Sequence, residues 1–312
     1  MLSRVADSLY WMARYIERAE HTARLIAVKL ESQVEQSSED ARASWLRTVQ
    51  ALSGEEFVED KFDAFAATDA LAFARENPSS LISSLRSARD NARQIREQLS
   101  TEVWEQLNRL YLRLQPATLT AFWTHQPTEF FRGVLSDLHT VEGVAYSTLG
   151  HGEGWYFLEL GRYIERAQAV SRLLDLYFGA SFAGAPHYFD WLMLLKFCSA
   201  FEPYCKAHTA AIKPERIAEF LVFDREFPHS LSFSIDRIGA ALSHVAPGAP
   251  TARRAACERL AGRLKASVDF GHIDELMKGS VAGFLAETTR QCERIHDAVY
   301  ATYIAYGAES VL

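Results

Sequence analysis

A six-residue segment rich in arginine and glutamate occurs twice in this chain. Its first copy runs from Arg14 to Ala19, and the identical residues return from Arg162 to Ala167, 148 positions later. Across residues 14–25 and 162–173, eight of twelve positions agree. Chance does not produce such a match in a chain of this length, so we expect two related helical halves.

The charges of this segment suit the binding of an anion. In a helix, with about 100° between residues, the polar positions share one side, opposite an apolar stripe. The planar guanidinium of arginine binds carboxylate or phosphate through paired hydrogen bonds, and a nearby glutamate can orient it or accept from a substrate amine. The candidate substrate-binding residues on this face are Arg14, Glu17, Arg18, His21 and Arg24 in the first copy, and Arg162, Glu165, Arg166 and Arg172 in the second.

A solvated amphipathic face gives the same residue pattern and needs no ligand. Exposed glutamate–arginine pairs are common on helices and add little stability. The recurrence of the charged positions counts against this interpretation, because an ordinary solvated face tolerates many residue types. Both interpretations of the repeated face remain open at the level of the sequence.

A second group of arginines follows one stripe of a predicted helix, at spacings of three, four and three. Such a stripe would suit a phosphate or an acidic partner. Opposite charges four residues away, Arg86 with Asp90 and Arg93 with Glu97, are more typical of an exposed helix, and we favour that interpretation. The stripe consists of Arg86, Arg89, Arg93 and Arg96, of which Arg89 and Arg93 are retained as candidate binding residues.

A third group lies in residues 227–237. Ser230 is expected to cap a helix after the turn at Pro228. His229, at the start of this helix, could serve as an acid, a base or a capping group, and capping or packing is favoured. Asp236 and Arg237 follow about two turns along the same helix and complete the set of candidate binding residues.

The elements that must position these groups are helices. Apolar residues recur at alternating spacings of four and three from Val5 to Leu30, and again from Phe157 to Phe178. We therefore expect repeat helices near residues 3–31 and 153–179, each roughly 40 Å long. The small residues Ala19 and Ala167 would let a neighbouring helix approach closely.

The rest of the chain shows the same period. A stripe from Leu81 to Leu99 is followed by Ser100, which predicts a break and a new helix start. Residues 231–235 alternate like a strand but return to helical spacing. We expect an all-α fold, a bundle of about a dozen helices in two pseudo-repeated halves, forming a single domain over residues 1–312. The longest expected loops are residues 31–40 and 246–251.

Composition excludes several classes of protein. The chain has 312 residues, a net charge of −7 and a pI of about 5.8, which disfavours nonspecific binding of nucleic acid. Charged residues near the N-terminus argue against a signal peptide. The most apolar stretch, Trp191 to Phe201, is too short for a membrane span. We expect a soluble cytoplasmic protein, without nucleic-acid or membrane partners, whose four cysteines are reduced.

Motifs for metals, nucleophiles and nucleotides are poor. Glu293 and His296 form one ExxH pair, whereas a di-iron helical bundle needs two such pairs and bridging carboxylates. The chain has no GxxxxGK phosphate loop. We therefore expect neither a metal nor a cofactor in this chain, and no self-contained catalytic motif.

The repeated segments resemble the paired Glu-Arg motifs of the alpha-E family, an all-helical bacterial family. The resemblance extends from Leu2 to beyond Arg237 and thus covers essentially the full length. Two positions depart from the family pattern, His229, where arginine is more usual, and Asp90, where glutamate is. Further similar stretches are residues 77–80 with 88–93, residues 102–108, and residues 227–230 with Asp236 and Arg237.

The resemblance implies a setting and a function. Family members accompany, or are fused to, circularly permuted ATP-grasp proteins, and transglutaminase-like proteins and a proteasome-like peptidase often occur with them. It thus implies a component of an ATP-dependent system that forms amide bonds or modifies peptides, with ATP and Mg held by the partner. The arginine-rich surface would then bind an anionic or activated acyl or peptide substrate.

The alternative is a non-catalytic scaffold or specificity subunit in which the Glu-Arg pairs are structural. Burial and pairing distinguish the two roles. Guanidinium groups that converge on a cavity would favour substrate binding. Arginines already satisfied by neighbouring carboxylates would favour the scaffold.

Overall fold

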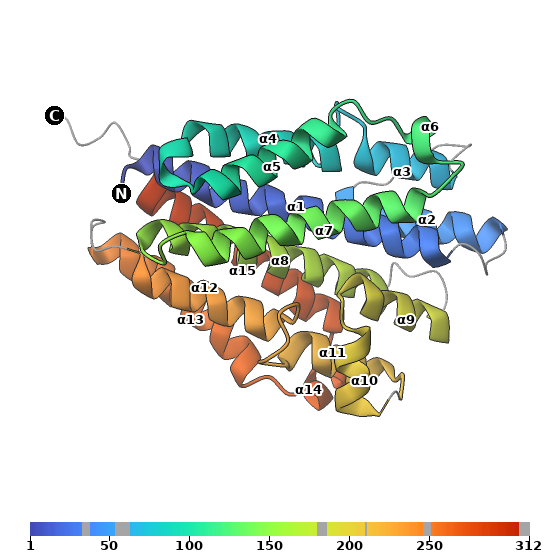
Figure 1. Cartoon of the computed structure of the whole chain (residues 1–312). Helices are drawn as coiled ribbons and strands as arrows, with labels where there is room; N and C mark the ends of the chain where they lie inside the picture. Colours follow the sequence, from blue (N-terminus) through green and yellow to red (C-terminus); the bar gives the residue numbers. More distant parts are fainter. Residues whose placement is uncertain (33–37, 54–62, 180–185, 210, 246–250, 306–312) are drawn as a thin grey trace. The chain divides into compact units, whose positions relative to one another are not determined.

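A computed structural model describes residues 1–32, 38–53, 63–179, 186–209, 211–245 and 251–305 (Figure 1). Within these ranges the chain is helical, with no strand, which confirms the all-α prediction. Of the loops expected at 31–40 and 246–251, residues 33–37 and 246–250 lie outside the described residues. The described ends of both are helical, in α1, α2 and α13, so the expected loops were too long. The chain divides into two compact units, unit 1 (residues 1–14 and 150–312) and unit 2 (residues 15–149).

The helix α1 (Ser3–Ser32) contributes to both units, because the division falls between Arg14 and Tyr15. Its apolar stripe is buried from Val5 to Leu30, as the periodicity predicts. The second repeated segment lies in α8 (Glu153–Phe178), which belongs to unit 1. The two-halves interpretation of this repeat stays a prediction.

Unit 2 is completed by helices that follow one another along the chain. Within it, α5 packs against both α4 and α7, and α3 packs against α2, α4 and α6. The helices are α2 (Ser38–Ser53), α3 (Ala64–Ala72), α4 (Leu81–Gln94), α5 (Thr101–Leu114), α6 (Leu119–Phe122) and α7 (Pro127–Thr148), with a 3-10 turn at Arg96–Gln98.

Unit 1 is built around four helices that form a closed ring of contacts. The helix α8 packs against α12 and α15, and α13 packs against the same two. The ring encloses the apolar side chains of α8, nearly all of which are buried. The helices of unit 1 after α8 are α9 (Tyr188–Phe197), α10 (Phe201–His208), α11 (Pro214–Phe223), α12 (Leu231–His244), α13 (Thr251–Asp269), α14 (Ile273–Lys278) and α15 (Val281–Val299), followed by a π-helical turn at Tyr300–Ile304.

Serine caps fix several helix starts where the sequence predicts them. Ser100 accepts a hydrogen bond from the backbone N–H of Val103 at 3.2 Å, which begins α5. Ser230 accepts from the N–H of Phe233 at 3.0 Å, which begins α12. Each cap satisfies one of the backbone donors that a helix start leaves without a partner. The region 231–235 is therefore helical, as expected.

One glycine allows a close approach between helix backbones in unit 1. A Cβ atom on Gly161 of α8 would lie 2.2 Å from the carbonyl oxygen of Tyr10 in α1 and 3.3 Å from the Cβ of Ala13. Real contacts of this kind are never so short, so only glycine fits at this position. The approach brings the residues just beyond Gly161 on α8 against the first part of α1.

Candidate functional site

The Arg14 cluster comprises Tyr10, Arg14, Glu165, Gln168 and His296, all in unit 1. Arg14 Nε donates to the Glu165 carboxylate at 2.8 Å, and Nη2 donates to the Gln168 side-chain oxygen at 2.9 Å. Arg14 and Glu165 are 6% and 2% exposed, so water screens this ion pair only weakly. Burial, the largest single cause, would lower the pKa of Arg14, but the Glu165 charge, Tyr10 and the hydrogen bonds to both together raise that pKa.

Tyr10 extends the cluster towards α15. Arg14 Nη1 donates to the Tyr10 hydroxyl at 3.4 Å, and that hydroxyl lies 2.8 Å from Nδ1 of His296. The guanidinium can only donate, so the Tyr10 oxygen accepts from Arg14, and the hydroxyl and Nδ1 of His296 share a second hydrogen bond whose donor depends on the histidine tautomer. Burial is the main cause that raises the pKa of Tyr10. The tyrosine therefore stays neutral.

The sequence did not identify Tyr10, Gln168 or His296 as members of this cluster. His296 was considered only as half of a metal motif, and the structure instead stacks its ring on Tyr10, with centroids 5.6 Å apart. Burial and the nearby Arg14 charge both lower the pKa of His296. Tyr10 and His296 lie 286 positions apart, and no short-range spacing signals such a contact.

The lowered pKa of His296 predicts a loss of stability in mild acid. Above about pH 6.5 the histidine is neutral in both folded and unfolded chains. As the pH falls towards the folded-state pKa, the unfolded chain binds the proton first, so the free energy of unfolding decreases. Urea denaturation between pH 7.5 and 5 should show a steeper loss for the wild type than for the His296→Gln variant.

The exposed His125 offers a matched control for this measurement. His125→Gln should keep the steep wild-type dependence on pH, since its side chain is already in water. Besides the ring of Trp11, the groups that face His296 are Tyr10, Arg14, Glu165, Asp297 and Tyr300, and all of them remain in both variants. Equal slopes for the wild type and His296→Gln would contradict the prediction.

The second copy of the motif forms different contacts in unit 1. Buried Glu159, which the sequence did not identify, accepts from Arg237 Nε at 3.1 Å and lies 3.5 Å from Arg162 Nη1. The predicted Asp236–Arg237 segment is thus joined to α8 through Arg237. Burial lowers the pKa of Arg237, but the hydrogen bond to Glu159 and its charge raise it overall.

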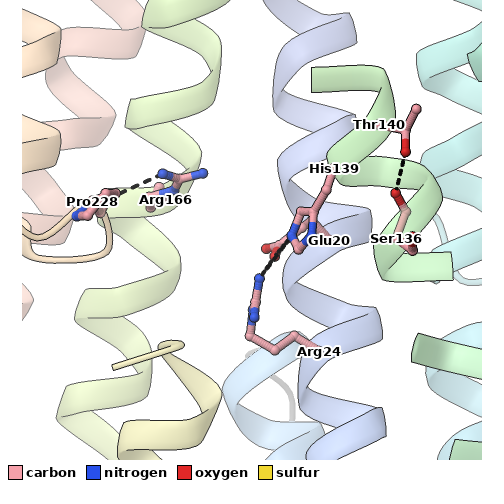
Figure 2. Close-up of polar contacts among 7 residues, drawn as sticks. All are labelled: Glu20, Arg24, Ser136, His139, Thr140, Arg166 and Pro228. Carbon is pink, nitrogen blue, oxygen red and sulfur yellow. Dashed lines mark hydrogen bonds and ion pairs between the residues drawn. The ribbon is translucent and has the colours of Figure 1, made fainter. Parts of the chain in front are cut away.

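Arg166 contacts the turn that precedes α12. Its Nη1 donates to the carbonyl oxygen of Pro228 at 3.3 Å (Figure 2). Its guanidinium lies over the Tyr163 ring. Arg166 is 7% exposed. The neighbouring His229 is half-buried, with its ring 6.0 Å from that of Phe227. This arginine therefore supports the turn from which Ser230 caps α12.

In unit 2 the first copy contributes a second charged group, the Glu20 cluster. Glu20, Arg24 and His139 meet where α1 faces α7, and Glu20 is paired with Arg24 and lies 3.3 Å from His139 Nε2 (Figure 2). Glu20 is 2% exposed. The repeat did not indicate Glu20, because the second copy has Gln168 at that position.

The remaining members of the first copy lie in the same stretch of α1. Glu17 is 2% exposed. Arg18 is half-buried, with its guanidinium 5.5 Å from the centre of the Tyr15 ring, and His21 is also half-buried. Of the repeat arginines, Arg172 is exposed.

The arginine stripe of α4 ties two helices of unit 2 together. Arg89 Nε donates to Asn108 of α5 at 2.9 Å, and the guanidinium lies over the rings of Trp104 and Tyr111. Arg93 is exposed and lies 3.8 Å from Asp90. The sequence predicted that Asp90 pairs with Arg86, whereas it lies 3.4 Å from Arg89. The stripe also ends early, because α4 stops at Gln94, before Arg96.

These positions overturn the solvated-face interpretation for the central residues of the repeat. Several charged side chains of the repeat, in α1 and α8, are under 10% exposed, whereas a solvated face would leave them in water. Arg14 is satisfied by a carboxylate, an amide oxygen and a hydroxyl, which favours a structural role for this arginine. The buried charged residues of the repeat are Arg14, Glu17, Glu165 and Arg166.

Within the described part of the chain, no group of three or more His, Cys, Asp or Glu side chains is arranged to hold a metal ion. The helices of that same part are all too short or too polar to cross a lipid bilayer. The site that the geometry defines is therefore a set of arginine–carboxylate clusters within helical units.

An all-helical chain with paired, buried Glu-Arg motifs is what the family model of Alpha-E describes, "a predicted alpha-helical domain with a conserved ER motif". That model matches residues 1–304, and this chain belongs to the Alpha-E family. The resemblance deduced from the repeated segments is thereby confirmed.

Curated relatives occur in mycobacteria. An uncharacterized protein of Mycobacterium bovis and two of Mycobacterium tuberculosis are each 25% identical to this chain over 333 aligned positions. The alignments cover 97% of this chain but 37% of each relative, so the chain spans little more than a third of their length. No solved structure matches it.

Proposed function

We propose that this chain is the helical scaffold and specificity component of an ATP-grasp-linked system that forms amide bonds or modifies peptides. In this proposal a circularly permuted ATP-grasp protein holds ATP and Mg and activates an acyl group. The Alpha-E chain binds the anionic or activated substrate next to that partner. Transglutaminase-like and proteasome-like peptidase proteins are further proposed partners.

The buried Arg14–Glu165 pair is the observation that carries the scaffold role. A guanidinium that is 6% exposed and already bonded to three side chains cannot meet a substrate without breaking those bonds. Breaking a buried pair costs several kcal/mol, more than most single ligand contacts return. The pair therefore supports a role in holding α1 on α8.

Substrate binding falls in this proposal to the charged groups that remain accessible. Arg18 and Arg162 are half-buried, and the Arg237 side chain is 42% exposed although Glu159 orients it. A guanidinium fixed by one carboxylate keeps further donors for a second anion, and prior orientation lowers the entropy cost of binding. The greater length of the mycobacterial relatives supports the idea that this domain works alongside others.

The test is product formation by the cognate ATP-grasp protein, with and without this chain. Mass spectrometry would follow ATP-dependent products over a panel of amino acids and short peptides. We expect an amide product that requires both proteins, or a substrate range that narrows when the chain is present. Identical products and rates without the chain would contradict the proposal.

Variants connect this assay to the arginines. The Arg18→Ala/Arg162→Ala double variant should reduce product at least tenfold while its far-ultraviolet circular dichroism stays helical, because both side chains are only half-buried. Arg132→Ala, at an arginine 49% exposed on α7, is the matched control and should keep the wild-type yield. Wild-type yield from the double variant would leave these arginines without a role in binding.

A further inference from the structure

A groove of about 620 Å³ lies between α12 and α13 in unit 1. The two helices pack side by side, and small residues form the middle of the groove, Gly239 and Ala240 on α12 and Ala261 and Gly262 on α13. Its volume lies within the range usual for small-molecule sites, about 300–1,000 Å³. None of these four residues belongs to the clusters described above.

The two glycines have no packing reason to be in these helices. A Cβ atom on Gly239 or on Gly262 would meet no atom within 4 Å, so neither position needs glycine for the approach of another element. Glycine inside a helix is less favourable than alanine by about 0.8–1.0 kcal/mol in general. Gly161 shows the opposite case, in which the neighbouring backbone leaves no room for a side chain. At Gly239 and Gly262 the absent side chains leave the groove open.

Charged groups stand at separate places along this groove. Lys265 and Arg237 lie towards one end, where Lys265 bonds Asp236 and lies 3.1 Å from Asp269. Glu258 lies seven residues before Lys265 on α13, which corresponds to about 10 Å along the helix. The groove thus has two cations and the Asp236 carboxylate at one end, the Glu258 carboxylate nearer the other, and small residues between them.

The charged groups keep hydrogen-bonding capacity beyond their contacts in the described residues. An ammonium has three donors, and carboxylates take two of those on Lys265. Arg237 donates to Glu159 through Nε and Nη2 and also hydrogen-bonds Tyr163, and with five N–H groups its guanidinium keeps further donors. Glu258 accepts from Arg254 through one carboxylate oxygen, which leaves the other for an ammonium.

We propose that this groove binds a short zwitterionic peptide of about three residues, with its C-terminal carboxylate at Lys265 and Arg237 and its amino group at Glu258. Three extended residues span about 10 Å, which matches the separation of the charged groups. A ligand with both charges but no net charge suits a groove whose cations and carboxylates balance. The proposal deepens the function proposed above and rests on it for the role of the peptide, whereas its test needs no partner protein.

Calorimetric titration of the full chain with trialanine tests the proposal. We expect a dissociation constant below about 1 mM, and at least fivefold weaker binding of both N-acetyl-trialanine and trialaninamide, because each lacks one terminal charge. Equal affinity for the three peptides would overturn the proposal. So would the absence of trialanine binding at a concentration tenfold above the expected limit of about 1 mM for the dissociation constant.

Two variants place the peptide in the groove. Gly262→Leu should abolish trialanine binding by filling the groove, while Tm stays equal or rises, because the added side chain meets open space. Gly143→Leu on α7 of unit 2 is the matched control, since a Cβ there also meets nothing within 4 Å, and it should bind like the wild type. Unchanged binding by Gly262→Leu would overturn the proposal.

Replacing Lys265 tests whether its end of the groove binds the C-terminal carboxylate of the peptide. Lys265→Met should weaken trialanine at least fivefold but leave trialaninamide unchanged, because the lysine meets only the terminal carboxylate. An equal effect on both peptides would overturn the assigned orientation. Trialanine binding without any effect of this chain on ATP-dependent products would contradict the proposed function and leave the groove assignment intact.

Discussion

Replacing Arg14 by methionine should destabilise the protein by about 3–5 kcal/mol, because it removes one partner of a buried ion pair, the Arg14 cation that contacts the Glu165 carboxylate at 2.8 Å. The Gln168 oxygen and the Tyr10 hydroxyl would lose donors at the same time. Urea denaturation followed by circular dichroism measures this change in the free energy of unfolding. A loss below about 1 kcal/mol would show that water reaches the pair.

The double variant Arg14→Met/Glu165→Met separates the cost of removing one partner from the contribution of the whole pair to stability. Both charges are then gone, so we expect it to be more stable than Arg14→Met alone, with a coupling energy of about 2 kcal/mol or more. Arg254→Met is the matched control, since its pair with Glu258 is partly exposed, and it should cost less than about 1 kcal/mol. Additive single effects would contradict a direct interaction.

Gly161→Ala should cost about 3 kcal/mol or more, although it adds a single methyl group. That methyl would overlap the carbonyl oxygen of Tyr10, and a helix backbone cannot move aside as a flexible side chain can. Separating α1 from α8 would also lengthen the Arg14–Glu165 contact four residues further along α8. The near-ultraviolet signal of Tyr10 and Trp11 should change together with the stability.

Gly239→Ala is the control, and its expected change in the free energy of unfolding has the opposite sign. Its added methyl meets no atom within 4 Å, so the better helix propensity of alanine should stabilise the chain by up to about 1 kcal/mol. Both changes are glycine to alanine within helices of unit 1. Equal effects at the two positions would mean that the close approach at Gly161 does not restrict the fold.

Apolar periodicity and capping chemistry predicted the helical class because both are local properties. Ser100 and Ser230 each bond a backbone N–H three residues ahead, so the sequence contains both partners of the contact. A close approach between helices depends on partners far apart in the chain. The expectation that Ala19 and Ala167 let a neighbouring helix approach closely stays a prediction. A close backbone contact that the sequence did not indicate forms at Gly161, whose partner Tyr10 lies 151 positions away.

The repeat singled out Arg14 and Glu165 as candidate residues but could not give their exposure. A helical wheel places Arg14 and Glu165 opposite the apolar stripes, and it does not indicate that a second helix covers them. Their partners Tyr10, Gln168 and His296 come from three different helical stretches, which only the tertiary fold brings together. Buried charge is expensive, and a pattern of polar and apolar positions does not show where that cost is offset.

The division of α1 between the two units has a consequence for biosynthesis. Residues 1–14 are translated before Glu165, the partner of Arg14, which follows 151 positions later. At about 5–20 residues per second, residues 1–14 wait roughly 8–30 s for that partner. During this interval all of unit 2 is translated and can fold, while Tyr10 and Arg14 remain without their contacts in α8 and α15. Ribosome-bound chains halted before residue 150 should therefore expose this segment to proteases and chaperones.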